Sequence, residues 1–235
     1  MLEAEAVFFD AAGTLFEVRG SVGKIYSAIA HRYGAHTDPE SLDQEFARAL
    51  RTKSALGLVS TGAQDTATEE RRWWFDIVER VLAGRIPRDG FNAYFDEVFE
   101  FFRSADAWQL YPDTLPCLEH LRCLGCGLGI ISNFDSRLID LLVNLGIGRF
   151  FAAVTLSWKA GVAKPDPQIF LKATDAMGVP GSKALHVGDS FEEDFEGARR
   201  AGLQAVLLDR MDRYNQKTNL LRVRTLSELC RLLEK

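Results

Sequence analysis

Three apolar runs of this sequence each lead into a side chain that could do chemistry. The run Ala6–Phe9 is followed by Asp10, and two later apolar runs lead to Ser132 and Asp189. Open α/β folds bind their ligands at the carboxyl ends of the strands. The sequence therefore predicts a site where carboxylates and a hydroxyl meet at one edge of a sheet.

Asp10 opens a segment that turns at Gly13, and two roles are open for its carboxylate. An aspartate close to a glycine is common in turns, where its side chain bonds nearby backbone groups. A carboxylate can also act as a covalent nucleophile, which divides one difficult group transfer into two easier steps. Both interpretations fit this segment taken alone.

Lys164 lies in a stiff loop with Pro165 and Pro167, ahead of a helix predicted over residues 168–177. A lysine there can stabilise negative charge that develops during a reaction, or it can be a solvated loop residue. Ser132 can likewise hold an anion or cap a helix. The combination of these segments favours the chemical interpretation of each.

An ordered set of residues resembles the four motifs of the haloacid dehalogenase superfamily: Asp10, Ser132, Lys164, and Asp189 with Asp194. Members of that superfamily are mostly magnesium-dependent phosphohydrolases. The set spans essentially the whole chain in the family's order. The resemblance implies an α/β fold with a Rossmann-like parallel sheet, helices on both faces and an inserted all-helical cap domain.

The resemblance also implies a Mg²⁺ site made by the first and fourth motifs. Asp10 and Asp189 would supply side-chain oxygens, and Ala12 would supply its backbone carbonyl, a role that does not depend on the side chain. Asp194 would be the supporting carboxylate that holds metal-bound water or Lys164. Oxygen ligands of this kind are those that Mg²⁺ prefers.

The remaining roles implied by the resemblance concern a phosphorylated substrate. Asp10 would be the nucleophile and would carry the phosphoryl group as an aspartyl-phosphate. Ser132, Asn133 and Lys164 would bind that group, the first two as a strand-end anion site of backbone N–H groups and a hydroxyl. The implied substrate is a small phosphorylated metabolite.

Position 12 departs from the phosphatases of the superfamily, which carry a second Asp there. That Asp protonates the leaving group and then activates water, and a positioned acid–base contributes roughly 10²–10⁴-fold. Ala12 cannot transfer a proton. We expect an enzyme that is impaired, acts on acyl or aryl phosphates or takes its acid from elsewhere, or else a non-catalytic phosphate- or metabolite-binding protein.

Two other chemistries of the superfamily stay open. Phosphonoacetaldehyde hydrolase also has Ala at this position and uses a cap lysine, for which Lys24 and Lys53 are the candidates here. Dehalogenases also lack the second Asp, but they need no metal. The acidic fourth motif, Asp189 with Glu192–Asp194, favours a cation, so we expect phosphate chemistry ahead of hydrolysis of a carbon–halogen or carbon–phosphorus bond.

Composition limits the partners that are expected. The chain has 235 residues, a net charge of −5 and 47% hydrophobic residues, with 16 Phe. It shows no basic stripe, no apolar run long enough to span a membrane and no signal-peptide pattern. We expect a cytoplasmic protein, monomeric or homodimeric, that binds neither nucleic acid nor membranes.

The cysteines and histidines are expected to be structural. Cys123 and Cys126 form a C-x-x-C pair, but no second close pair accompanies it, so reduced thiols are predicted. His186 lies inside an apolar run and is predicted to be a packed strand residue.

Residues 17–105 are predicted to form the cap. Amphipathic helices are expected after Ser21, Asp38, Thr66 and Asp89, and no strand is predicted among them. Four such helices indicate a helical bundle.

The helices of the cap carry stripes of Trp and Phe, which we assign to the bundle core rather than to substrate contacts. The candidates for reaching substrate are Arg19, Arg51 and Lys53, because caps of this family close over the site. A glycine-rich interruption at residues 57–62 could present further groups.

Residues 1–16 and 106–235 are predicted to form the Rossmann-like core. Helices and strands alternate after residue 106, which predicts a parallel sheet with right-handed crossovers. The expected elements are helices over 113–123 and 135–145, strands over 127–132, 152–156 and 204–208, and a final helix capped by Ser227.

Overall fold

The centre of the protein is a six-stranded parallel sheet, seen in a computed structural model that describes residues 3–54, 66–82, 84–217 and 220–233. The predicted Rossmann-like fold is confirmed. The strands follow in the order β5 (Ala153–Leu156), β4 (Gly127–Ser132), β1 (Ala6–Phe9), β6 (Ala184–Gly188), β7 (Gln204–Leu208) and β8 (Arg222–Val223).

The four residues of β1 are fully buried because helices cover both faces of the sheet. Val7 and Phe9 belong to one hydrophobic cluster, and Ala6 and Phe8 belong to a second one on the opposite face. This alternation follows from the two-residue period of a strand. The central position of β1 places the residue after it, Asp10, in the middle of the sheet edge.

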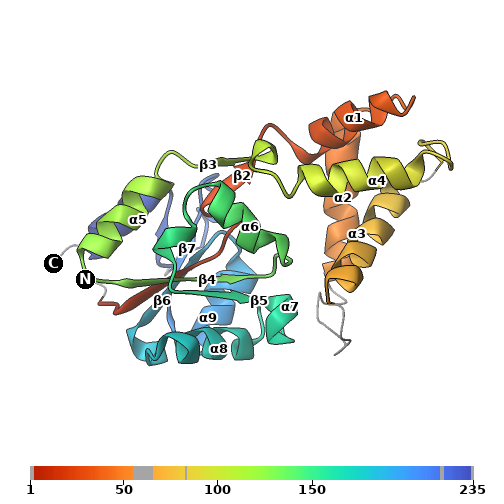
Figure 1. The fold of residues 1–235 in the computed structure, drawn as a ribbon. Coiled ribbons are helices and arrows are strands. Elements are labelled where there is room, and N and C mark those ends of the chain that lie inside the picture. Colours follow the sequence, from red (N-terminus) through yellow and green to blue (C-terminus); the bar gives the residue numbers. More distant parts are fainter. Residues whose placement is uncertain (1–2, 55–65, 83, 218–219, 234–235) are drawn as a thin grey trace.

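The helices of the core divide between the two faces of the sheet, as Figure 1 shows. One face carries α5 (Thr114–Cys123), α6 (Arg137–Asn144) and α10 (Leu226–Leu233). The other carries α8 (Pro167–Met177) and α9 (Gly197–Arg200), and α7 (Ser157–Ala160) follows β5. Short helical turns lie at η1 (Ala105–Ala107), η2 (Gly148–Phe150), η3 (Gly181–Lys183) and η4 (Phe191–Glu196).

Local capping signals explain where several helices begin. The Ser21 hydroxyl accepts a hydrogen bond from the Lys24 N–H, and the Asp38 carboxylate accepts one from the Ser41 N–H, as the sequence predicts. The final helix is different, since the Glu228 N–H bonds the Thr225 hydroxyl. The prediction of Ser227 as its cap is therefore wrong by two positions. The residue types alone do not separate the two candidates, because Thr225 and Ser227 both carry a hydroxyl.

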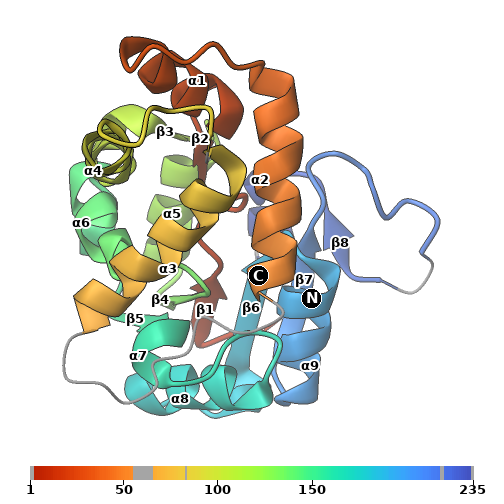
Figure 2. The ribbon, with the colours of Figure 1, turned by 90° about the vertical axis from the view of Figure 1, so that its right-hand side faces the viewer.

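Four helices form the cap beside the core: α1 (Val22–Arg32), α2 (Pro39–Ser54), α3 (Thr66–Leu82) and α4 (Phe91–Phe101). Figures 1 and 2 show them as one bundle at one end of the sheet. Tyr26, Phe46, Ile77 and Tyr94, one from each helix, are buried in its interior. None of the described helices is both long and apolar enough to cross a membrane.

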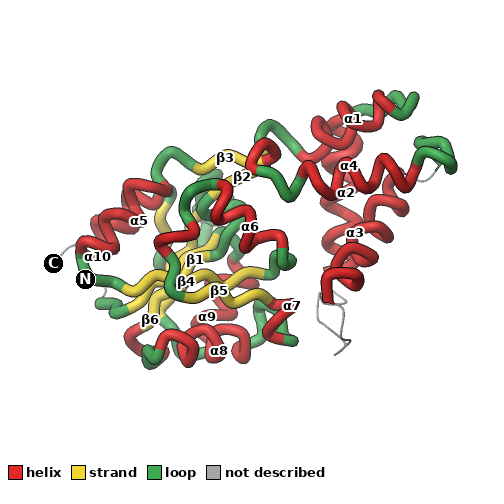
Figure 3. Tube along the Cα trace, viewed as in Figure 1, coloured by secondary structure: helices red, strands yellow, loops and turns green. Residues whose placement is uncertain are grey.

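A two-stranded antiparallel ribbon connects the cap to the core (Figure 3). It pairs β2 (Phe16–Val18) with β3 (Trp108–Leu110), so the prediction that residues 17–105 contain no strand is wrong. The boundary predicted after residue 16 cuts through β2. Three-residue strands are too short to show a period in the sequence, and their pairing partners lie about ninety residues apart.

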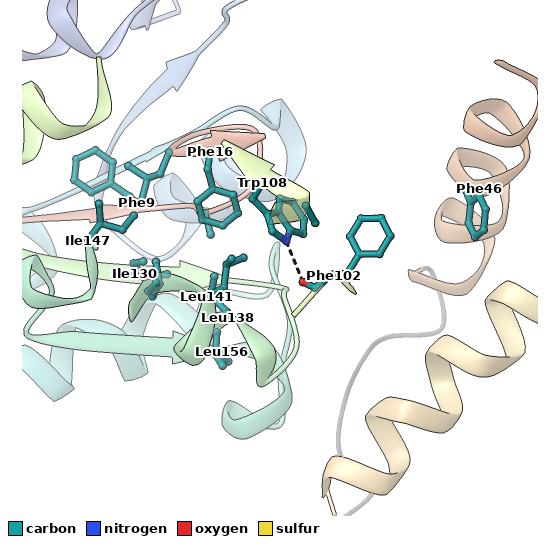
Figure 4. Close-up of a cluster of buried hydrophobic side chains, with 14 of the residues drawn as sticks. Phe9, Phe16, Phe46, Phe102, Trp108, Ile130, Leu138, Leu141, Ile147 and Leu156 are labelled. Carbon is teal, nitrogen blue, oxygen red and sulfur yellow. Dashed lines mark hydrogen bonds between the residues drawn. The ribbon is translucent and has the colours of Figure 1, made fainter. Parts of the chain in front are cut away.

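Arg19 stabilises this ribbon and does not line the catalytic cavity described below. Its guanidinium donates to the backbone carbonyls of Asp106 and Trp108 at 3.3 and 3.2 Å. The prediction of Arg19 as a substrate contact is therefore wrong. Close by, the Trp108 indole donates to the Phe102 carbonyl at 3.0 Å (Figure 4).

Candidate active site

The predicted site residues meet at the carboxyl edge of the sheet because β1 lies between β4 and β6. Asp10 follows β1, Ser132 ends β4 and Asp189 follows β6. The Asp10 N–H donates to the Val187 carbonyl at 2.9 Å, which fixes the end of β1 against β6. Strand order thus brings together side chains that are more than one hundred residues apart in the chain.

Lys164 is buried between two carboxylates of the site. Its ammonium donates to Asp10 Oδ1 and to Asp194 Oδ1, in each case at 2.6 Å. Burial alone would lower the pKa of Lys164, but the two carboxylates more than offset this and raise it. Lys164 is therefore a fixed positive charge directly beside Asp10.

The two carboxylates that contact Lys164 differ in their electrostatics. Burial raises the pKa of Asp10, although Lys164 opposes that rise. Burial also acts to raise the pKa of Asp194, but the attraction of Lys164 and the hydrogen bond from His186 outweigh it, so the net direction is downward. Asp194 is accordingly the more firmly ionised of the pair.

Both carboxylate oxygens of Asp194 already accept hydrogen bonds. Besides Lys164, Oδ1 contacts His186 Nε2 at 2.9 Å, and Oδ2 accepts the Ser190 N–H at 3.0 Å. A Cβ at Gly188 would lie 2.2 Å from the Asp194 carboxyl carbon, so the backbone needs glycine there. These contacts fit a supporting carboxylate, held in place to orient Lys164.

His186 is fully buried in β6, as predicted, and it also contacts Asp194. Burial lowers the pKa of His186, which keeps its ring neutral, so Nε2–H is the donor to the ionised carboxylate. This contact was not predicted. The sequence carries no signal for it, because the ring and the carboxylate meet through the wide helical turn η4, whose geometry is not visible in a residue pattern.

Among the described residues, Asp189 is paired with no buried cation, and the exposed Arg213 guanidinium lies 3.7 Å from its Oδ2. Burial, with the neighbouring charges of Asp10 and Asp194, raises the pKa of Asp189 to about 7. Gly13, at φ +90°, lies against this carboxylate, and a Cβ there would be 2.8 Å from Asp189 Oδ2. Glycine at position 13 is thus required by its backbone conformation and by the close approach of Asp189.

Asp10, Asp189 and Asp194 offer oxygen atoms that all lie within 4.8 Å of one another. Three carboxylates surround one buried lysine, and the exposed Arg213 guanidinium offsets the charge of Asp189 only in part, which favours a divalent cation. Carboxylate oxygens are also the ligands that Mg²⁺ prefers. The donor set therefore fits Mg²⁺, with Asp10 and Asp189 facing it and Asp194 already bound to Lys164.

Ser132 and Asn133 act on the site in different ways. The Ser132 hydroxyl lies 3.4 Å from Asp10 Oδ1 and accepts the Phe134 N–H at 3.3 Å. The Asn133 amide bonds both backbone groups of Lys164 and also Glu193. The Asn133 side chain therefore positions the Lys164 loop, so any contact of Asn133 with a phosphate would fall to its backbone N–H.

A cavity of about 290 Å³ lies over these groups. Its core side includes Asp10, Ala12, Lys164 and Asp189, and its cap side is formed by Leu50 of α2 with Trp73 and Trp74 of α3. The assignment of the Trp stripe to the bundle core is therefore incomplete for Trp73 and Trp74, which pack against the hydrophobic core and also line this cavity. An amphipathic pattern identifies the inward face of a helix but cannot tell a bundle interior from a ligand cavity.

The structure does not place the other cap residues that were predicted to contribute to the site in the lining of this cavity. Lys24 is exposed and does not line the cavity. The side chains of Arg51 and Lys53, and residues 57–62, lie outside the described residues. Among the described residues that line the cavity, Lys164 is the one cation.

Hydrogen bonds hold α3 of the cap against the loop after β4. The Trp74 indole donates to Asp135 Oδ2 at 2.6 Å, and Glu70 accepts the Ser136 N–H at 2.9 Å and the Ser136 hydroxyl. Arg137 donates to both oxygens of Asp135, at 2.9 and 2.7 Å. The structure therefore represents a cap that is closed over the site.

The cysteines are free thiols, in agreement with the prediction. Cys123 is exposed, and the Cys126 thiol lies 3.6 Å from the Ala4 carbonyl. The C-x-x-C pair therefore lies apart from the site.

Comparison with known proteins matches this geometry. A family model described as haloacid dehalogenase-like hydrolase matches residues 4–202 of the chain. The chain belongs to this family. The resemblance predicted from the four motifs is thereby confirmed, and the protein is a haloacid dehalogenase-like hydrolase with a helical insertion after its first motif.

Two curated relatives are informative. The haloacid dehalogenase-like hydrolase domain-containing protein 3 of Danio rerio is 32% identical over 216 residues, covering 91% of this chain and 88% of that protein. A glyceraldehyde 3-phosphate phosphatase of Methanopyrus kandleri is 38% identical over 119 residues, covering 50% of this chain and 48% of that protein.

Solved structures of a phosphatase and of a dehalogenase both resemble this hydrolase. A HAD phosphatase from Thermococcus onnurineus has a TM-score of 0.67 at 25% identity, with 97% of each chain covered. A 2-haloacid dehalogenase from Pseudomonas syringae has a TM-score of 0.68, also at 25% identity and 97% coverage of each chain. Similarity alone therefore does not choose between the two chemistries.

Proposed function

We propose that this protein is a Mg²⁺-dependent phosphohydrolase that acts on a small phosphorylated metabolite through an aspartyl-phosphate at Asp10. The observation that carries the proposal is the pairing of Lys164 with Asp10 and Asp194, at 2.6 Å each, beside the additional carboxylate of Asp189. The carboxylates of this site outnumber the lysine beside them. This favours binding of a divalent metal ion, and of an anionic substrate together with it, over binding of a neutral substrate. The relatives that include phosphatases support the same proposal.

Asp10 would attack the phosphorus atom, and the bond from phosphorus to the leaving-group oxygen would break. Lys164 and the Ser132 hydroxyl, which both contact Asp10, would hold the oxygens of the transferring group and stabilise their charge. Mg²⁺, when bound, would neutralise further negative charge on the phosphate. Water would then attack the phosphorus of the aspartyl-phosphate, which releases phosphate and restores the Asp10 carboxylate.

The leaving group is expected to depart without help from an acid. Ala12 cannot donate a proton, and the described cap residues that line the cavity, Leu50, Trp73 and Trp74, carry no ionisable group. On the core side, Asp135 is bound to Trp74 and Arg137. Glu193 accepts the Asn133 amide, and Asp189 would hold the cation. Acyl and aryl phosphates, whose leaving groups are weak bases, are therefore the expected substrates.

The test is phosphate release from acetyl phosphate and an aryl phosphate, with Mg²⁺ and with a chelator. Asp10→Asn should lower kcat/KM by at least about 10³-fold, as loss of a nucleophile does. Asp175→Asn, at an exposed position of α8, is the control and should retain activity. Absence of release at high enzyme concentration, with phosphate binding retained, would instead indicate a non-catalytic binding protein.

Dehalogenation is a second candidate, favoured by Ala12 and by the apolar cap side of the cavity. It also fits the Pseudomonas syringae neighbour. Halide release from 2-chloropropionate in the presence of a chelator would support it. Phosphate release that requires Mg²⁺, without halide release, would reject it.

A further inference from the structure

The cap helices, the β2–β3 ribbon and the segment after β4 together line a second cavity of about 150 Å³, called the cap cavity here. Apolar side chains from four different elements line it: Val22 of α1, Phe46 of α2, Val98 of α4 and Trp108 of β3. Figure 4 shows two of these aromatic residues, Phe46 and Trp108. Because the cavity is bounded mainly by the cap helices, it is separate from the carboxylates of the active site.

The cap cavity is adjacent to the catalytic cavity. Leu50, Trp74 and Phe134 line both of them, so these three side chains form the shared wall. Trp74 is fixed by its hydrogen bond to Asp135, whereas Leu50 has an aliphatic side chain that can change rotamer. A group that leaves the catalytic cavity past Leu50 therefore enters an apolar space.

The charged residue at the edge of this cavity is already neutralised. Arg137 donates to both oxygens of Asp135, and its guanidinium lies 4.2 Å from the centre of the Phe99 ring. It is therefore not available to recruit a charged ligand. The chemistry of the walls selects an apolar occupant.

The volume sets the size of that occupant. A cavity of about 150 Å³ is large enough to hold a molecule of the size of benzene. We propose that the cap cavity is a subsite for the apolar part of the leaving group, an aromatic ring or an aliphatic chain of about six carbons. This inference rests on the proposed function, and it specifies the substrate class as acyl or aryl phosphates with an apolar tail.

A comparison of two acyl phosphates tests binding in this subsite without changing the basicity of the leaving group. Acetyl phosphate and hexanoyl phosphate release carboxylates of similar basicity, so Ala12 affects both in the same way. Each fully buried methylene contributes about fourfold to binding. We therefore expect kcat/KM with Mg²⁺ to be at least about tenfold higher for hexanoyl phosphate.

Two substitutions should remove this preference by filling the cavity. Val98→Phe and Val22→Phe act from different helices, and neither residue lines the catalytic cavity. Each should bring hexanoyl phosphate to within about twofold of acetyl phosphate, with acetyl phosphate turnover unchanged. Val143→Phe, at a residue 67% exposed on α6, is the control for the substitution itself.

Binding of phosphonates distinguishes failure of the subsite from failure of the proposed hydrolysis. Calorimetry with Mg²⁺ should show that hexylphosphonate binds at least about tenfold more tightly than methylphosphonate, and that Val98→Phe abolishes the difference. Binding of this kind without turnover of either acyl phosphate would reject the hydrolase and retain the subsite. Equal affinities, or a tail preference that survives in both folded Phe variants, would overturn the inference.

Discussion

The loops at the sheet edge and the cap helices above them enclose one cavity with opposite kinds of side chain. The loops contribute Asp10, Lys164 and Asp189, which are charged and fixed by short hydrogen bonds or close backbone packing. The cap contributes Leu50 and Trp73 with a large apolar surface. The difference indicates that the core holds the reacting phosphoryl group, while the cap selects the rest of the substrate.

The contrast is sharpest at position 12, where Ala12 stands beside Asp10 in place of an acid and the described cap lining supplies no ionisable group. Ala12→Asp would add a proton donor beside Asp10, so turnover of alkyl phosphates should rise by roughly 10²–10⁴-fold. Aryl and acyl phosphates should gain much less, because their leaving groups depart unprotonated. The measurement is kcat on matched alkyl and aryl esters.

Ala12→Asn is the matched control for that variant, since its amide has the size of Asp and cannot transfer a proton. Equal gains on both classes of ester, or a gain with Asn, would refute the dependence on leaving-group basicity.

The charged core should also depend strongly on Lys164, the one buried lysine among the residues that the structure describes. Lys164→Met would leave Asp10 and Asp194 buried without their cation, which should lower the free energy of unfolding by roughly 3–5 kcal/mol. Urea denaturation without divalent cations would measure this. Lys172→Met, at an exposed position of α8, should change stability little, and an equal loss in the two variants would contradict the assignment.

Removal of a hydrogen bond between the cap and the core should have a smaller effect than removal of Lys164. Trp74→Phe keeps an aromatic wall but removes the 2.6 Å hydrogen bond to Asp135, a bond to a charged acceptor worth about 1.5–3 kcal/mol. Loss of this bond should reduce the fraction of molecules in which the cap is closed. The value of kcat/KM should therefore fall by about tenfold on every substrate. The control is Trp158→Phe, because the buried Trp158 indole has no hydrogen-bond partner among the described residues.

If Trp74→Phe leaves turnover unchanged, closure of the cap does not depend on this hydrogen bond. If it lowers turnover of long-chain substrates alone, Trp74 acts as a wall of the cap cavity and not as a closure contact.

The smallest expected effect is a pH dependence at Glu70, another cap residue that is bonded to the core. Burial raises the pKa of Glu70, against the hydrogen bonds from Ser136 that lower it. A raised carboxyl pKa contributes stability that is present below the unfolded value and is lost as the pH rises through the folded value. The stability of the native protein relative to Glu70→Gln should therefore decline from about pH 4 toward neutrality.

Urea midpoints across that pH range would measure the difference, with Glu79→Gln on the exposed side of α3 as control. A difference that stays constant, or that grows with pH, would show that the Glu70 contact does not titrate with the closed cap.

Much of the secondary structure could be predicted because its signals are local. The apolar run before Asp10 becomes β1, and the Ser21 and Asp38 side chains cap helices within three residues of themselves. Such interactions depend on neighbours in the chain, so a residue pattern contains them. Short β2 and β3 lacked a pattern of useful length.

Contacts made through the fold were not predictable in the same way. Asn133 was predicted to bind phosphate through its backbone N–H, and only the structure shows that its side-chain amide bonds the Lys164 backbone. Trp73 and Trp74 looked like bundle core, but they also line the catalytic cavity. In each case the residue type was informative, and the identity of its partner depended on how distant segments pack.

The sequence by itself determined the parallel sheet, the four motifs and the loss of an acid at position 12, because these depend on local periodicity and residue identity. Only the tertiary structure decided which groups surround them. Strand order brought Asp10 within 2.6 Å of Lys164, and cap packing left an apolar cavity beside the site. Distances between remote residues follow from the packing of the whole chain, which no single segment encodes.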